Sequence, residues 1–210
     1  LQHFVTDWRR GFRYTAMTVR SLTAPLKIRY LRTLMSTYPA VGRGSFQCSD
    51  ERLNRIWKVG RHTLLCCMED TFTDCPTYEQ TFWVGDARNE ALICHAAYGE
   101  WALVERCVRL VPQSLYRSKL PESQVPSGWQ NILTAWSLLW IQMAHEYWWL
   151  SGDVATLEAV YPGVAQTLRA CRELSNNKWG LLSIRAWNMF DWSGADDDHD
   201  IVTHNNMFLA

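Results

Sequence analysis

The feature that most constrains the fold is a pair of long helical patterns joined by a very short connection. Residues 132–150 and 154–174 both repeat apolar side chains at helical spacing, and only residues 151–153, Ser-Gly-Asp, separate them. Two helices with so short a turn between them must run antiparallel and side by side. The polar residues within 132–150 favour a buried helix over a membrane span. The sequence therefore predicts a helical hairpin in the core.

Further helical patterns lie on both sides of this hairpin. They are expected from an N-cap at Ser49 towards Met68, from near Asp86 to a break at Gly99, over 101–115, and from near Thr203 onwards. Two long polar loops, residues 117–130 and 176–200, alternate with the short turns. Antiparallel helices with short turns at one end and long loops at the other predict an (α/α) toroid whose long loops line one cleft.

The N-terminal residues follow a different pattern. Residues 12–19 and 26–34 alternate apolar and polar side chains, which is the period of a half-buried strand. Two strands cannot form a stable sheet alone, so we expect them to complete a sheet with other strands. Gly42 and Gly44 mark a boundary, and we predict one domain over residues 1–43 and a second over 44–210.

Composition excludes several classes of function. Lysine plus arginine and aspartate plus glutamate both total 21, so no basic surplus is present to bind nucleic acid or an anionic membrane. The seven cysteines contain no C-x-x-C and show no zinc spacing, which indicates reduced core thiols and no metal site. No signal peptide is visible, and we expect a cytoplasmic protein without cofactors.

The stretch 74-DCPTYEQTFWVGD-86 is the strongest candidate for a functional site. It places Asp74, Glu79 and Asp86 among three aromatic rings, which include those of Tyr78 and Trp83. A carboxylate beside apolar rings loses hydration, which disfavours its charged form. Such an environment suits a carboxylic acid that stays partly protonated near neutral pH, and simple packing does not explain it.

The string D-C-P-x-x-E-x-x-x-W-x-G-D in this stretch resembles the signature of the α-L-rhamnosidases of glycoside hydrolase family 78. Weaker support comes from residues 45–57, 128–131, 190–192 and 203–210. The resemblance covers most of residues 40–210 and implies half of an (α/α)6 six-hairpin barrel, preceded by the last strands of a β-sandwich. The expected fold class is therefore mainly α, with the remaining barrel helices beyond residue 210.

The resemblance also implies an activity, which is inverting hydrolysis of terminal α-L-rhamnosyl residues on oligosaccharides, polysaccharides or glycosides. By motif position, Glu79 is the general acid, Asp74 and Asp86 hold the hydroxyls of the sugar, and Trp83 belongs to a hydrophobic wall. Trp129 and Trp192 are candidates for the same wall, because pyranose faces stack on broad rings. The general base is expected beyond residue 210, and the partner is a carbohydrate substrate.

Several of these residues have simpler interpretations. Asp86 could cap the helix that follows it, and Trp129 and Trp192 could be core residues. Asn131 stands where the family usually has Asp, and its amide carries no charge for a charge-based role. The run 196-DDDHD-200 fits acids at a helix N-terminus better than a metal site.

Two other functions remain open from the sequence. One is a carbohydrate-binding helical domain without turnover, and the other is a six-hairpin glycosidase or lyase for a different sugar. Within the chain, the spare acids that could serve as a base are Glu122, Asp191 and the 196–200 run.

Overall fold

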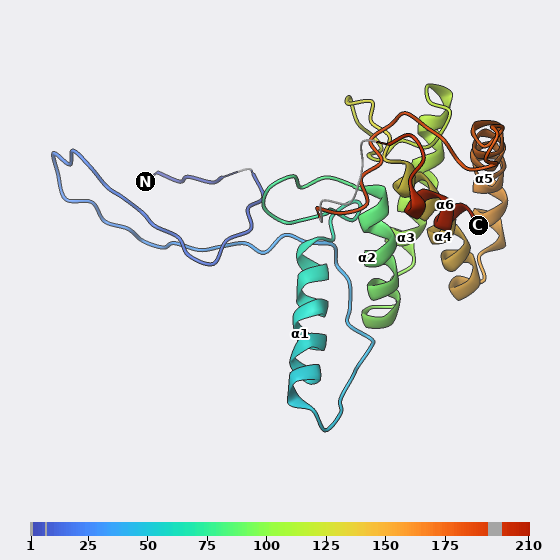
Figure 1. Ribbon diagram of the computed structural model, residues 1–210. Coiled ribbons are helices and arrows are strands. Elements are labelled where there is room, and N and C mark those ends of the chain that lie inside the picture. The colour runs from blue at the N-terminus through green and yellow to red at the C-terminus, as the bar shows by residue number, and fades with distance from the viewer. Residues whose placement is uncertain (1, 7, 193–198) are drawn as a thin grey trace.

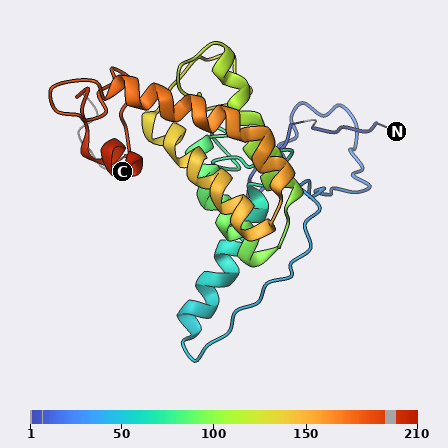
Figure 2. The same cartoon turned by 90° about the vertical axis from the view of Figure 1, so that its right-hand side faces the viewer.

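The computed structural model describes residues 2–6, 8–192 and 199–210 and is mainly helical (Figure 1). Its elements are α1 (Glu51–Cys66), α2 (Val84–Ala97), α3 (Ala102–Leu110), the 3-10 helix η1 (Val111–Tyr116), α4 (Thr134–Ser151), α5 (Val154–Leu174) and α6 (Thr203–Leu209). The predicted order of helices and loops is confirmed, and α4 and α5 form the predicted antiparallel hairpin (Figure 2).

Two helix boundaries differ from prediction for local reasons. Asp50, not Ser49, caps α1, because its side chain accepts a hydrogen bond from the Arg52 backbone N–H at 2.8 Å. The helix expected over 101–115 changes to 3-10 geometry after Leu110, next to Pro112. Proline cannot donate a hydrogen bond to the carbonyl four residues earlier. That carbonyl, on Val108, instead accepts the indole N–H of the fully buried Trp140 at 3.0 Å.

The α4–α5 hairpin is closed by specific turn chemistry. Gly152 ends α4 with φ +74°, a conformation that glycine adopts without strain. Asp153 then caps α5, since its carboxylate accepts the Thr156 N–H at 3.0 Å and the Tyr147 hydroxyl at 2.9 Å. The core lies where α1, α2, α3 and α4 meet, and Trp140, Met143 and Tyr147 of α4 are buried in it.

The strands expected over residues 12–19 and 26–34 are not formed. The described residues before α1 contain no strand, and this segment makes a long excursion away from the helices (Figure 1). The apolar side chains of residues 12–34 are exposed, as Tyr14 at 87% illustrates. A lone strand pair is unstable, and no further strand is present in the described part of the chain to complete a sheet. The domain boundary after residue 43 stays a prediction.

The long loops meet at one end of the helical array. The loop before α2 pairs with the loop before α4 through a bridge between Trp83 and Gln124. The loop before α6 joins them through a bridge between Leu133 and Trp187. The short connections, residues 98–101 and 152–153, do not take part in these bridges. No helix within the described residues has the length and apolar character that crossing a membrane requires.

Gly163 of α5 lies at a tightly packed contact with η1 and α4. A Cβ there would lie 2.7 Å from Pro112 Cβ and 3.2 Å from Trp140 Cη2, whereas a Cβ on Gly60 of α1 meets no atom within 4 Å. Replacing glycine by alanine in a helix gains about 0.5–1 kcal/mol, and overpacking costs about 1–3 kcal/mol. We therefore expect Gly163→Ala to lower the free energy of unfolding and Gly60→Ala to raise it, as measured by urea denaturation of the intact protein. Equal effects of the two substitutions would contradict this account of the packing.

Candidate active site

The motif loop between α1 and α2 is closed by a two-way pairing of Asp74 with Thr81. The backbone N–H of Asp74 donates to the Thr81 carbonyl at 3.0 Å, and the Asp74 carboxylate accepts the Thr81 N–H at 3.1 Å. The turn passes through Gln80 with φ +53°, and the Gln80 side chain donates to the Pro76 carbonyl at 2.7 Å. The loop is therefore compact and carries Glu79 at its exposed side.

Glu79 has a defined partner although it is exposed. The indole N–H of Trp83 donates to one carboxylate oxygen of Glu79, and the Glu79 backbone N–H lies 3.4 Å from the Cys75 sulfur. The spacing E-x-x-x-W of the motif thus produces a direct contact. One carboxylate oxygen is held by the indole, while the group as a whole stays accessible to a ligand.

Asp86 lies in the first turn of α2 and is held by a tryptophan from another helix. Its carboxylate accepts the indole N–H of Trp136, at the start of α4, at 3.1 Å. Burial raises the pKa of Asp86 to about 6, and the charges of Asp74 and Glu79 add to this rise. Hydrogen bonds from its own backbone N–H and from Trp136 act in the opposite direction.

Gly85 explains how the tryptophan reaches Asp86. A Cβ on Gly85 would lie 2.6 Å from Cε2 and 2.7 Å from Cγ of Trp136. These distances are too short for a non-bonded contact, so any residue larger than glycine would clash with the indole. The glycine of the motif therefore lets α2 approach the indole closely. Trp136 was not predicted from the sequence, because nothing near it in the chain links it to the motif.

Glu90 is a second residue near the motif that was not predicted from the sequence. It lies one turn after Asp86 on α2, and its buried Oε2 has no hydrogen-bond partner among the described residues. Burial raises its pKa to about 9, and the charges of Asp86 and Asp74 contribute further. Glu90 is therefore neutral near pH 7. The only sequence signal for it is the D-x-x-x-E spacing, which puts both acids on one face of a helix.

The aromatic wall consists of Trp83, Trp129, Trp187 and Trp192, which come from three different loops. Ring centroids lie 6.2 Å apart for Trp83 and Trp129, 6.3 Å for Trp83 and Trp187, and 6.5 Å for Trp187 and Trp192. Trp129 is 55% exposed and Trp192 is 83% exposed, so neither is a core residue. Trp187, which was not predicted from the sequence, is in ring contact with the other three.

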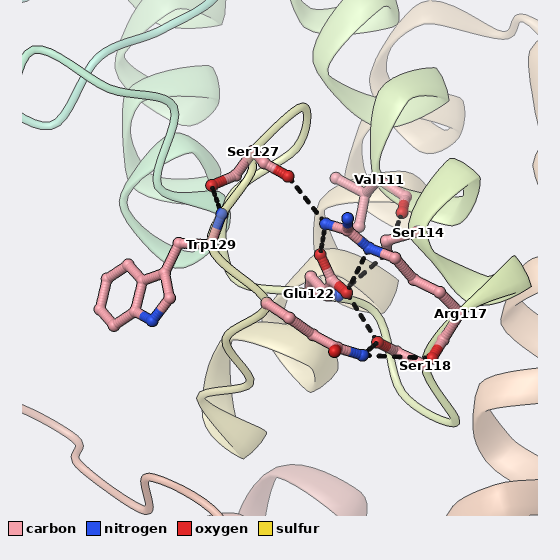
Figure 3. Close-up of polar contacts among 8 residues, drawn as sticks. Val111, Ser114, Arg117, Ser118, Glu122, Ser127 and Trp129 are labelled. Carbon is pink, nitrogen blue, oxygen red and sulfur yellow. Dashed lines mark hydrogen bonds and ion pairs between the residues drawn. The ribbon is translucent and has the colours of Figure 1, made fainter.

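The spare acids are placed differently from one another. Glu122 is fully buried and paired with Arg117, and Ser118 Oγ donates to it at 2.7 Å (Figure 3). Asp191 is exposed and accepts the Trp192 N–H at 2.7 Å. Asn131 is buried and its carbonyl accepts the Ser123 N–H at 2.9 Å. Glu122 is therefore not free to activate a water molecule.

The 196–200 run is placed only in part. Asp196, Asp197 and Asp198 lie outside the described residues. Within the described ranges, no group of three or more His, Cys, Asp or Glu residues is positioned to hold a metal ion.

The sequence model of the bacterial α-L-rhamnosidase six-hairpin glycosidase domain matches residues 42–209. The chain belongs to this family. A glycoside hydrolase family 78 rhamnosidase of Bacillus sp. GL1 is 46% identical and superposes with a TM-score of 0.80 over 82% of this chain and 18% of that one. No match was found among curated proteins. The chain thus spans about a fifth of the Bacillus rhamnosidase.

Two more distant structures share the fold of this rhamnosidase domain. A rhamnosidase from Klebsiella oxytoca with rhamnose bound is 21% identical, with a TM-score of 0.56 over 78% of this chain and 30% of that one. An α-L-rhamnosidase from Dictyoglumus thermophilum is 23% identical, with a TM-score of 0.60 over 66% of this chain and 16% of that one. The predicted fold class, a mainly helical part of a six-hairpin barrel, is confirmed.

The indole hydrogen bond to Asp86 leads to a test by pH. Donation by Trp136 stabilises the ionised carboxylate, so Trp136→Phe should raise the pKa of Asp86 above about 6. The measurement is a carboxyl-carbon NMR titration of Asp86 in the intact protein. Trp149→Phe, an exposed tryptophan at the other end of α4, is the matched control and should leave this titration unchanged. A downward shift in Trp136→Phe would contradict the assigned hydrogen bond.

Proposed function

We propose that this chain supplies the acid side of the active site of an inverting α-L-rhamnosidase, which removes terminal rhamnosyl residues from glycosides or saccharides. The observation that carries the proposal is the arrangement of Asp74, Glu79 and Asp86 on one loop and helix start, beside an aromatic wall. Family membership supports a carbohydrate substrate.

Glu79 is proposed as the general acid. Breaking a glycosidic bond requires a proton on the leaving oxygen, so the acid must be accessible to the substrate. Glu79 is exposed, and the Trp83 indole N–H holds one of its oxygens in a fixed direction. The other oxygen is then oriented to deliver the proton.

Asp74 and Asp86 are proposed to bind hydroxyl groups of the sugar. Carboxylates accept strong charge-assisted hydrogen bonds from hydroxyls. Asp74 has one carboxylate oxygen engaged with the Thr81 N–H, and the Asp86 carboxylate is held by the Trp136 indole and by its own backbone N–H. These hydrogen bonds fix the orientation of both carboxylates. The aromatic wall, with Trp187 added to Trp83, Trp129 and Trp192, is proposed to stack on the apolar face of the ring.

The general base is proposed to lie outside these 210 residues. An inverting site places its second carboxylate about 6.5–9.5 Å from the acid, with room for a water molecule between them. Glu122 is buried in an ion pair, which makes it unsuitable for this role. By resemblance to the family we assign the base to a glutamate in the remaining part of the barrel.

A non-catalytic carbohydrate-binding domain is the alternative, since the exposed tryptophans alone could bind a sugar. Turnover of a chromogenic α-L-rhamnoside by the intact protein, compared with a panel of other glycosides, separates the alternatives. Binding without release of the chromophore would favour the binding domain.

We also propose a cytoplasmic location, because all seven cysteines are free thiols and four of them are buried.

Glu79→Gln should reduce turnover of rhamnosides with poor leaving groups by about 10²- to 10⁴-fold, because the side chain keeps its shape but loses the proton to be transferred. A substrate with a very acidic leaving group should lose less, and rhamnose binding should persist. The measurement is kcat on both substrates, with the exposed Glu158→Gln on α5 as control. Near wild-type turnover of natural linkages would overturn the assignment of Glu79.

Asp74 can be tested with two replacements, because its carboxylate also closes the motif loop. Asp74→Asn keeps an acceptor for the Thr81 N–H but loses the charge, whereas Asp74→Ala loses both. Since a hydrogen bond to a charged group contributes about 1.5–3 kcal/mol, we expect Asp74→Asn to weaken rhamnose binding roughly tenfold or more and Asp74→Ala to weaken it further. Calorimetry on the intact protein measures both affinities. If both variants bound rhamnose like the parent, Asp74 would have no binding role.

A further inference from the structure

The loop between η1 and α4 contains a fully buried carboxylate. The Glu122 side chain has no exposed surface, and it forms a two-nitrogen ion pair with Arg117, in which Nε lies 2.8 Å from Oε1 and Nη2 contacts Oε2. Burying a carboxylate is unfavourable unless it is paired and hydrogen-bonded. A loop that buries a carboxylate therefore needs a cation and hydrogen-bond donors at defined positions, and apolar packing alone does not provide them.

The guanidinium of Arg117 connects this carboxylate to the far arm of the loop (Figure 3). Its Nη2 also donates to the Ser127 carbonyl at 2.8 Å, and Ser127 Oγ accepts the backbone N–H of Trp129 at 3.0 Å. The Gln130 side chain closes the same ring of contacts by donating to the Arg117 carbonyl at 3.2 Å. The indole of Trp129 points away from this polar network (Figure 3).

The near arm of the loop is fixed to the rest of the site. The Glu122 N–H donates to Ser114 Oγ of η1 at 2.9 Å. The next residue, Ser123, accepts the N–H of Val84, the first residue of α2, at 2.9 Å. The polar network of Arg117 thus joins the loop of Trp129 to the helix that begins at the motif.

Trp129 needs such a support because its own packing is weak. It is 55% exposed, and its ring contacts are an edge contact with Trp83 and a tilted contact with Trp187. An apolar contact would fill space without fixing a direction, whereas a bidentate arginine–carboxylate pair fixes both distance and orientation. The contacts that position Trp129 are thus polar, and they lie on the side of the loop that its indole points away from (Figure 3).

We propose that Arg117 and Glu122 are positioning residues that hold Trp129 in the aromatic wall, and so set the affinity for the sugar without touching it. The proposal rests on the proposed function for its kinetic part. Its structural part, the fixing of Trp129 by the ion pair, does not depend on which sugar is bound or on whether it is hydrolysed.

The structural part is tested by hydrogen–deuterium exchange of the intact protein without substrate. Arg117→Met should speed exchange in peptides from 117–131 by about tenfold while α5 keeps its protection. Because this variant leaves Glu122 unpaired, the double variant Arg117→Met/Glu122→Leu, which removes both charges, guards against general unfolding. Unchanged exchange at 127–131 in the double variant would overturn the proposal.

The kinetic part is tested by coupling to Trp129→Ala. If the ion pair acts through Trp129, the double variant should raise KM about tenfold with kcat little changed, and adding Trp129→Ala should have little further effect. Arg109→Met, which breaks the Arg109–Glu105 pair on α3, is the matched control and should add independently to Trp129→Ala. Additive effects of the double variant and Trp129→Ala would also overturn the proposal. Absence of rhamnoside turnover in the parent would refute the proposed function, and exchange would still decide the structural part.

Discussion

The close approach of α2 to α4 at Gly85 is the contact on which the rest of the site depends. Because Gly85 has no side chain, the indole of Trp136 lies against the backbone of α2 and reaches the Asp86 carboxylate. This contact fixes the start of α2, and with it the end of the motif loop that carries Trp83. Glu79 is oriented in turn by the Trp83 indole. A glycine at this position therefore contributes to the positioning of Glu79.

The helical part of the fold could be predicted because its signals are local. Apolar spacing, Gly152 and Asp153 define the α4–α5 hairpin within a few residues of each other, and the structure has α5 over Val154–Leu174 as predicted. The strands over 12–19 and 26–34 failed as predictions for the opposite reason. A strand is stabilised by backbone partners elsewhere in a sheet, and alternation of side chains does not supply them.

The positions of the candidate site residues were predictable only where one motif contains them. Asp74, Glu79 and Asp86 stand at fixed spacing in a single string, so sequence alone could place them together. Trp136 lies 50 residues beyond Asp86, and its contact depends on how two helices pack. Trp187 joins the aromatic wall through a bridge between two loops. Such contacts are properties of the tertiary structure, and no local sequence pattern predicts them.

The extended arms over 12–19 and 26–34 have a consequence for the chain's behaviour in solution. Among the described residues their backbone groups form no hydrogen bond to another segment, and their apolar side chains are exposed. Backbone of this kind is open to pairing with an added strand. Arg13, Lys27, Arg29 and Arg32 are interleaved along these arms, and residues 8–36 contain no acid. Repulsion between like charges thus opposes pairing of the arms with those of a second copy. Dissolved salt screens that repulsion, so the barrier to self-association falls as ionic strength rises.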